Sequence, residues 1–270
     1  MKILFTFPGQ GGQRPGMLAA LPDREAILTQ ARAVLGNEVA TLDSADALQH
    51  TRAVQLCLLI AGVAWARELQ RQGVDPQMVS GLSIGAFPAA VIAGALDFAS
   101  ALRLVALRGD LMEQAYPEGY GLTAIMGLTR PRVEALMQGH EVYLANLNAE
   151  TQFVIAGRDE AMAEVAQLAK AFAGASLRRP WCAYLSGSTA RVLWDPQRIA
   201  DDLAMNMARP VHWQEAMVAA DERDARLAIE MPPGGVLTCL TRQAGWRGET
   251  IALERSGLDV ARHLAQRLSD

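Results

Sequence analysis

The segment VSGLSIGAFPAAV, residues 79–91, places a serine in a setting that suits nucleophilic chemistry. Gly81, Ser83 and Gly85 fit the pattern G-x-S-x-G, which follows an apolar run and precedes an alanine-rich run. We expect a strand, a sharp turn and a helix, with the serine at the strained turn and the backbone N–H of Ile84 facing an oxyanion. The motif indicates acyl transfer, although glycine and serine are also common in ordinary strand-to-helix turns.

A second glycine-rich segment, FPGQGGQR, follows the first apolar run of the chain. It lacks the third glycine of a dinucleotide-binding fingerprint, because Arg14 stands at that position and Pro15 follows. Glycines on both sides of Gln10 let the backbone approach a ligand closely, so the N–H of Gln10 is a second candidate donor to an oxyanion. The alternative interpretation is a simple turn.

Two more polar residues lie in runs that are predicted to be helical. The planar guanidinium of Arg108 could bind a carboxylate through two parallel hydrogen bonds, or it could be an ordinary solvated helix arginine. Gln55 lies in an otherwise apolar run. If its amide is buried it needs hydrogen-bonding partners in the protein, whereas at the edge of the buried helix face it could bond to water. Spacing alone does not decide between these alternatives.

The elements that would position these residues alternate between strands and helices. Residues 2–7 are predicted to form a strand, and helical sequence follows to about residue 50. Apolar residues recur at helical spacing in VQLCLLIAGVAWARELQRQG, which ends on Gly73. A further helix is predicted over residues 98–115, with Asp97 as its N-terminal cap.

From residue 122 the order of predicted elements becomes β-α-β-β-α-β over roughly 65 residues, which is typical of a ferredoxin-like unit. The α/β pattern returns after it, with helices over residues 196–207 and 213–222, then a strand, a helix, a strand and a last helix. The sequence therefore predicts an α/β protein. Residues 1–121 and 191–270 would form a large subdomain, and residues 122–190 an inserted small one.

Composition excludes several classes of protein. The chain has 270 residues, of which 51% are hydrophobic and 20% charged, which is ordinary for a folded globular protein. A net charge of −4 without a basic cluster argues against nucleic acid as a partner. No apolar run approaches the roughly 18 to 20 residues of a membrane span or resembles a signal peptide, so we expect a cytoplasmic protein. The three cysteines are expected to be reduced and mostly buried rather than zinc ligands: Cys57, Cys182 and Cys239.

Six segments follow one another in a set order and spacing: FPGQGGQRPGM, TRAVQ, GLSIGAFPAAVIAGALDFASALRLVALRGDLM, GYGLTAIMGL, NMARPVHW and IEMPPGGVLTCL. Together they resemble the malonyl-CoA:acyl carrier protein transacylase family along nearly the whole chain. Within that family, the short chain and the GLSIGAF segment are most similar to the epsilon subunit of malonate decarboxylase. The resemblance implies an α/β-hydrolase-like large subdomain, a ferredoxin-like small one and a site in the cleft between them.

The resemblance also implies roles for individual residues. Ser83 matches the acyl-accepting serine, and Arg108 matches the arginine that holds the free carboxylate of malonate. The N–H groups of Gln10 and Ile84 match the oxyanion hole, and Gln55 matches a glutamine near the pocket. These matches imply a malonyltransferase that moves the acyl group from malonyl-CoA to the thiol of an acyl carrier protein, without a metal or bound cofactor. In the malonate decarboxylase case, the transfer would prime the carrier subunit.

Two positions depart from the family pattern. Leu82 replaces the histidine of the usual G-H-S-x-G elbow, which is expected to change packing rather than chemistry. When YLSGSTARVLWDP is aligned without gaps to the segment that carries the family's histidine base, Ala190 stands at the position of that histidine. A serine hydroxyl needs a base to become a good nucleophile, and alanine accepts no proton. His212 is the best stand-in, whereas Ser188 and Thr189 could hold a water but are not bases.

Several interpretations remain open at this stage. The alanine could be natural to this branch, or it could be a substitution of the histidine. A serine thioesterase or hydrolase would use water as the acceptor, although the arginine-bearing helix and the FPGQG opening argue against it. A scaffold that binds the carrier or a CoA thioester without forming an acyl-serine is the third alternative.

Overall fold

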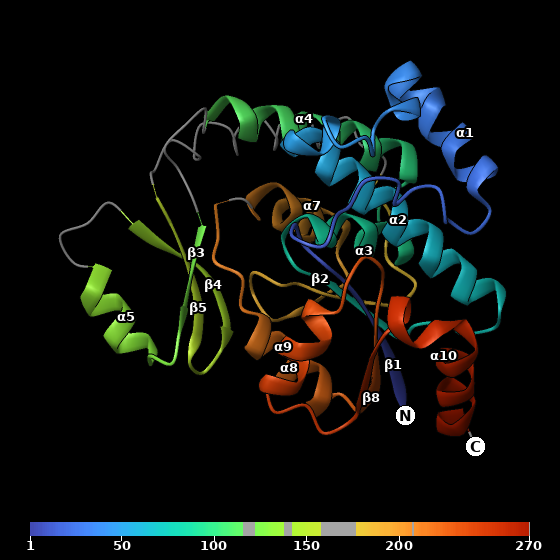
Figure 1. Cartoon of the computed structure of the whole chain (residues 1–270). Coiled ribbons are helices and arrows are strands. Elements are labelled where there is room, and N and C mark those ends of the chain that lie inside the picture. The colour runs from blue at the N-terminus through green and yellow to red at the C-terminus, as the bar shows by residue number, and fades with distance from the viewer. Residues whose placement is uncertain (116–121, 138–141, 158–176, 207, 270) are drawn as a thin grey trace.

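The computed structural model describes residues 1–115, 122–137, 142–157, 177–206 and 208–269. They form a large unit built on a six-stranded sheet and a small unit built on a three-stranded sheet, which lies to one side in Figure 1. The strands of the large sheet are β1 (Lys2–Phe7), β2 (Met78–Gly81), β6 (Ala183–Leu185), β7 (Val192–Leu193), β8 (Ala225–Glu230) and β9 (Glu249–Ala252). The helices of the large unit are α1 (Arg24–Leu35), α2 (Thr51–Arg71), α3 (Ala86–Ile92), α4 (Phe98–Ala115), α7 (Pro196–Met205), α8 (Trp213–Glu222), α9 (Val236–Gln243) and α10 (Leu253–Ser269).

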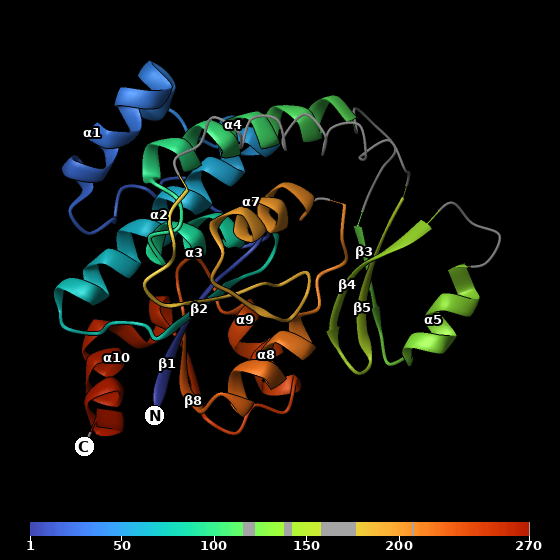
Figure 2. The same cartoon turned by 180° about the vertical axis from the view of Figure 1, so that it is seen from behind.

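The large sheet has the order β7-β6-β2-β1-β8-β9, and all its neighbouring strands are parallel except the edge pair β6 and β7. Helices cover both faces, as expected for parallel strands. Ile3 and Phe5 pack in one core with α1 to α4, α7 and α10, whereas Leu4 between them packs in a second core with α8 and α9. This alternation follows from the two-residue period of a strand. Figure 2 shows the same layers from behind.

The connections of β1 define where a site is expected. The chain continues from β1 to β2 on one side, while β8 pairs with the other side of β1. In open α/β sheets, ligands bind at the carboxyl ends of the strands where the strand order reverses in this way. The loops after β1 and β2 meet there, because the N–H of Leu82 donates to the carbonyl of Phe7 at 3.0 Å.

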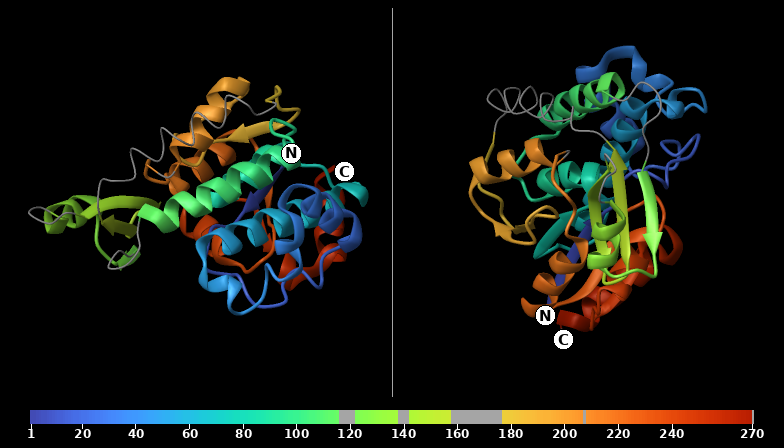
Figure 3. Two further views of the ribbon diagram at one scale, coloured as in Figure 1. Left: turned by 90° about the horizontal axis from the view of Figure 1, so that it is seen from above. Right: turned by 90° about the vertical axis from the view of Figure 1, so that its left-hand side faces the viewer.

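The predicted cap of α4 is confirmed. This helix begins at Phe98, and the carboxylate of Asp97 accepts a hydrogen bond from the N–H of Ser100 at 2.8 Å. Figure 3 shows α4 running from the large unit toward the small sheet, so its C-terminal half, which carries Arg108, lies near the junction of the two units. Among the described helices, none combines the length and the apolar character needed to cross a bilayer.

The small unit consists of β3 (Leu122–Met126), α5 (Arg130–Met137), β4 (Val142–Ala149) and β5 (Gln152–Gly157), with the sheet order β3-β5-β4. Its β-α-β-β order matches the first part of the predicted ferredoxin-like pattern. Strand β4 is tied to the large unit through Val211, whose carbonyl accepts from Leu147 at 2.6 Å and whose N–H donates to Ala145 at 2.7 Å.

The structure corrects the predicted end of the small unit. The segment expected to supply its last strand does form a strand, β6, but β6 pairs in parallel with β2 of the large sheet. The three residues of β6 are all buried, which agrees with the strand predicted here. The sequence did not show which sheet this strand would join. The helix predicted for residues 159–174 lies outside the described residues.

Candidate active site

Ser83 lies at a sharp turn between β2 and α3, as the motif predicts. Its φ of 53° is in the left-handed region that side chains rarely adopt, which marks the strained elbow. The flanking glycines are required by close backbone approach. A Cβ atom on Gly81 would lie 2.1 Å from the backbone of Gly85, and a Cβ on Gly85 would lie 2.1 Å from the carbonyl oxygen of Phe7. The G-x-S-x-G pattern is therefore a steric requirement of this turn.

Gly85→Ala should lower the free energy of unfolding by at least about 2 kcal/mol, since the new methyl group meets backbone atoms that cannot move aside easily. Gly73→Ala is a suitable control, because Gly73 has a φ of 82° and no atom within 4 Å of a built Cβ. It should cost only about 1 kcal/mol of backbone strain. Denaturant unfolding measures both values, and equal losses would contradict the steric explanation.

Arg108 on α4 is placed directly at the serine. Its Nη2 donates to Ser83 Oγ at 3.0 Å and to Asn206 Oδ1 at 3.2 Å. The residue is 1% exposed, and within the described part of the chain its Nε and Nη1 have no hydrogen-bond acceptor. Burial lowers the pKa of Arg108 to about 9, so the side chain keeps its positive charge at neutral pH. A buried guanidinium with unused donors suits a carboxylate held next to the nucleophile.

Asn206, at the end of α7, is the first residue of the NMARPVHW segment, and reasoning from the sequence gave it no role. Its Nδ2 donates to the carbonyl of Ser83 at 2.9 Å, while its Oδ1 accepts from Arg108. One amide therefore joins the serine elbow to the arginine. The residue is separated from Ser83 by 123 positions, so the family resemblance marked its segment but no local pattern assigned its amide to the serine.

Gln55 on α2 is fully buried, which decides between the two alternatives left open by the sequence. Its Nε2 lies 3.1 Å from the sulfur of Met112 and 3.4 Å from Oε1 of Gln10, while no donor in the described residues reaches its Oε1. Gln10 lies in the turn after β1, and its side chain is exposed. The structure thus brings Gln10 and Gln55 together.

Ile84 follows the serine in the elbow, and its side chain is fully buried. The segments that carry Gln10 and Ile84 follow the neighbouring strands β1 and β2. The two backbone N–H groups predicted to form an oxyanion hole therefore belong to adjacent loops at the carboxyl edge of the sheet.

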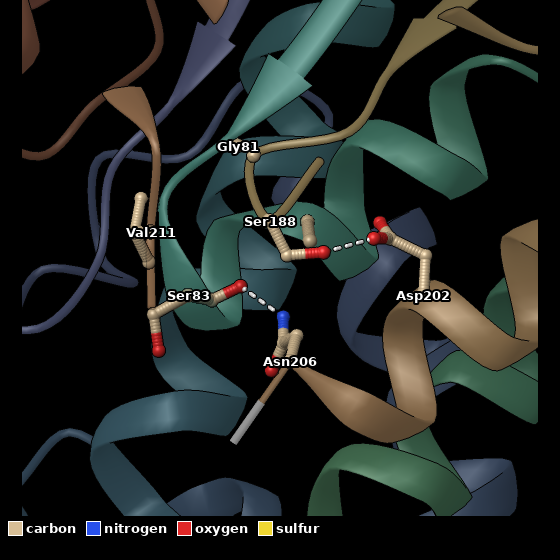
Figure 4. Close-up of a pocket in the computed structure, with 8 residues that line it drawn as sticks. Gly81, Ser83, Ser188, Asp202, Asn206 and Val211 are labelled. Carbon is tan, nitrogen blue, oxygen red and sulfur yellow. Dashed lines mark hydrogen bonds between the residues drawn. The ribbon is translucent and has the colours of Figure 1, made fainter. Parts of the chain in front are cut away.

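A narrow pocket with a cavity volume of about 10 Å³ opens beside Ser83. Figure 4 shows Ser83, Ser188, Asp202 and Asn206 arranged around it, with Ser188 bonded to Asp202. The complete lining is Gly81, Ser83, Ala86, Gly187, Ser188, Asp202, Asn206 and Val211. The pocket therefore combines the end of β2, the elbow and the start of α3 with residues that follow β6, residues at the end of α7 and the segment that contacts the small unit.

Ala190 and His212, the residues considered for the role of the base, are not part of this lining. Ala190 has a φ of 55°, donates its N–H to the carbonyl of Ser186 at 3.0 Å and packs against the second core. His212 precedes α8, and its Nδ1 lies 3.0 Å from a carboxylate oxygen of Glu215. Thr189 is exposed, whereas its neighbour Ser188 points into the pocket.

The two other histidines that the structure describes lie away from the pocket. His50 contacts Glu113 at 3.5 Å, His263 belongs to α10, and His140 is outside the described residues. Within the described ranges, no group of three or more histidine, cysteine, aspartate or glutamate side chains could hold a metal ion. Two of the three cysteines are buried, Cys57 and Cys182, in agreement with the prediction that they are mostly core residues.

A serine elbow at the carboxyl edge of a parallel sheet is the kind of site that performs acyl transfer. Residues 4–184 match the family model described as acyl transferase domain. The malonyl CoA-acyl carrier protein transacylase of Escherichia coli (strain K12) is 33% identical over 286 residues, covering 90% of this chain and 92% of the relative. The chain therefore belongs to the malonyl-CoA:acyl carrier protein transacylase family of acyltransferases.

Solved structures agree with this assignment. The acyl-carrier-protein S-malonyltransferase of Burkholderia pseudomallei 1710b has a TM-score of 0.89 and 30% identity, and the match covers 97% of this chain and all of that chain. The corresponding enzyme of Vibrio cholerae has a TM-score of 0.84 and 31% identity, with 93% and 96% covered. These neighbours show the α/β fold of the family.

The chain is shorter than its relatives within the aligned region. The alignment with the Escherichia coli protein has 286 positions, but 90% of this chain's 270 residues is only about 243 residues, so roughly 40 positions lack a counterpart here. The alignment without gaps that places Ala190 at the family's histidine position therefore stays a prediction.

Proposed function

We propose that this chain transfers a malonyl group from malonyl-CoA to the thiol of an acyl carrier protein through an ester on Ser83. The observation that carries the proposal is the contact between Arg108 and Ser83, 3.0 Å from Nη2 to Oγ. A buried cation with unused donors beside the nucleophile favours an acyl group that ends in a carboxylate, as malonyl does. The names of the relatives support the same substrates, since they are malonyl CoA-acyl carrier protein transacylases.

In the proposed reaction, Ser83 Oγ attacks the thioester carbonyl and the N–H groups of Gln10 and Ile84 stabilise the oxyanion. The C–S bond then breaks, coenzyme A leaves, and the carrier thiol attacks the acyl-serine in the second step. Arg108 holds the malonyl carboxylate during both steps, and the buried Gln55 borders the acyl group. One related structure contains a polyketide acyl carrier protein in complex with its malonyl-transacylase, which supports a carrier protein as the acceptor.

We propose further that the carrier is the one of malonate decarboxylase, with this chain acting as the epsilon subunit. The support is the short chain and the GLSIGAF elbow. To test this assignment, the malonyl-enzyme is supplied with a malonate decarboxylase carrier and, separately, with a fatty acid synthesis carrier. Faster transfer to the former is expected, and a clear preference for the latter would contradict the subunit assignment.

Intact-mass measurement tests the main proposal. The protein should gain one malonyl group when incubated with malonyl-CoA, and the group should move to the carrier when the carrier is added. Release of malonate without a carrier would instead indicate a hydrolase. Binding of malonyl-CoA without any adduct would indicate a scaffold, an alternative favoured because none of the described residues that line the pocket is a histidine.

The Ala190→His variant tests the predicted position of the base in the same assay. A histidine within reach of Ser83 should accelerate acylation by about 10² to 10⁴, the usual contribution of a general base. An unchanged rate would show that residue 190 is not at the family's base position, in line with its place outside the pocket lining.

A further inference from the structure

We propose that Asn206 is a positioning residue for acyl transfer, whose amide holds the peptide that follows Ser83 at one end and the guanidinium of Arg108 at the other. The inference rests on the proposed function and concerns what aligns its two binding groups. Asn206 follows α7, is partly buried and lines the pocket beside the serine. Figure 4 shows its amide nitrogen turned toward the carbonyl of Ser83.

The donor end of the amide acts on the serine elbow. Its Nδ2 donates to the Ser83 carbonyl at 2.9 Å, and the N–H of Ala86 donates to the same oxygen at the start of α3. Two bonds to one carbonyl help to hold a residue whose φ of 53° lies in the left-handed region. The carbonyl of Ser83 and the N–H of Ile84 belong to one planar peptide unit, so fixing the first also fixes the direction of the second. This N–H is one of the two proposed donors to the oxyanion.

The acceptor end of the amide acts on the arginine. Oδ1 of Asn206 accepts from Nη2 of Arg108 at 3.2 Å, and the same nitrogen donates to Ser83 Oγ at 3.0 Å. Because Nη2 carries two protons, the two oxygens engage both of them and fix the plane of the guanidinium. Nε and Nη1 have no acceptor in the described part of the chain. Asn206 therefore orients the group that is proposed to bind the malonyl carboxylate.

The neutrality of the amide matters for specificity. Arg108 is 1% exposed, and among the described residues no carboxylate forms an ion pair with it. A carboxylate at position 206 would bind the guanidinium through charge-assisted hydrogen bonds and compete with the substrate. An apolar side chain there would leave a buried donor without its partner. Asparagine supplies a donor and an acceptor on a short side chain and leaves the positive charge for the acyl group.

A purely structural role for Asn206 makes a different prediction. The residue ends α7, so its amide also stabilises the contact of this helix with the elbow. Loss of stability alone lowers the amount of folded protein and slows both acyl-CoA substrates by the same factor. A change in the ratio of the malonyl rate to the acetyl rate is therefore the measurement that identifies positioning of Arg108.

The test measures acylation of Asn206→Ala and Asn206→Asp by intact mass, with malonyl-CoA and separately with acetyl-CoA. Asn206→Ala should acylate at least about tenfold more slowly with both substrates, because the elbow and the guanidinium each lose a bond that aligns them. In Asn206→Asp, the malonyl-to-acetyl ratio should also fall at least about tenfold, since the new carboxylate occupies Arg108. Acetyl has no carboxylate that competes for this group.

Gln197→Glu is the matched control. It makes the same change from amide to carboxylate on α7, but Gln197 is exposed and donates to Asp201 at 3.1 Å. Both rates and their ratio should equal those of the unmodified chain. Denaturant unfolding of every variant accompanies the rates, so that a loss of folded protein is separated from a loss of alignment.

The outcomes are distinct. Slow acylation in Asn206→Ala with native unfolding, together with a lower ratio in Asn206→Asp, supports the inference. Rates in Asn206→Ala equal to those of the unmodified chain overturn it. A folded Asn206→Asp that keeps the unmodified ratio overturns it as well, even if Asn206→Ala fails to fold. These results require an adduct on the unmodified chain, whereas no adduct on that chain refutes the proposed function itself and the inference with it.

Discussion

Ser83→Ala should abolish the malonyl adduct, with acylation reduced at least about 10⁴-fold, since the replacement removes the only atom that forms the ester in the proposed reaction. The side chain of Ser83 is partly buried at a left-handed turn, and alanine occupies that backbone conformation as readily as serine. The variant should therefore fold normally. Intact mass with malonyl-CoA is the direct measurement.

Ser80→Ala is the matched control for this change. Ser80 lies on β2, three residues before the nucleophile, and its hydroxyl donates to the carbonyl of Leu185 at 2.9 Å. Losing that bond should cost about 1 kcal/mol of stability without preventing acylation. An adduct that persists on Ser83→Ala would mean that another side chain carries the acyl group, and peptide mapping would identify it.

The second large effect is expected at Arg108. Arg108→Ala should lower kcat/KM for malonyl-CoA about 10-fold to 100-fold relative to acetyl-CoA, because charge-assisted hydrogen bonds to a carboxylate contribute about 1.5 to 3 kcal/mol. The acetyl group has no carboxylate, so acetyl-CoA loses no such contact in the variant. The ratio of the two substrates is the quantity to measure, since Arg108 also bonds Ser83 and Asn206 and its loss can slow both reactions.

Arg103→Ala provides the control on the same helix. Arg103 is exposed and donates to Ser100 at 3.1 Å, away from the pocket. Its loss should leave the malonyl-to-acetyl ratio unchanged. An unchanged ratio in Arg108→Ala would refute the assignment of the carboxylate site, whatever the absolute rates.

Much of the local structure was predictable because it depends on short-range chemistry. The glycines around Ser83 predicted a tight elbow, and a Cβ atom added to Gly81 or to Gly85 would lie only 2.1 Å from backbone atoms. Asp97 predicted the start of α4, where its carboxylate accepts from the backbone of Ser100. Such features are encoded within a few residues, so a single sequence displays them.

The assembly of the site was not predictable in the same way. The resemblance implied that Arg108 shares a site with Ser83, but no local pattern placed its guanidinium at the serine hydroxyl or the amide of Asn206 at the serine carbonyl. The pairing of β6 with β2 carries Ser188 into the pocket, whereas the sequence suggested that this strand belonged to the small unit. Asp202 was hidden for the same reason, since a carboxylate on a helix is usually solvated.

By itself, the sequence determined the α/β alternation, the elbow that exposes Ser83 and the helix that bears Arg108, because periodicity, glycine sterics and capping act between near neighbours. Only the tertiary structure decided which side chains surround the serine. Strand pairing and helix packing bring together residues more than one hundred positions apart, and these long-range contacts depend on burying complementary surfaces rather than on any local pattern.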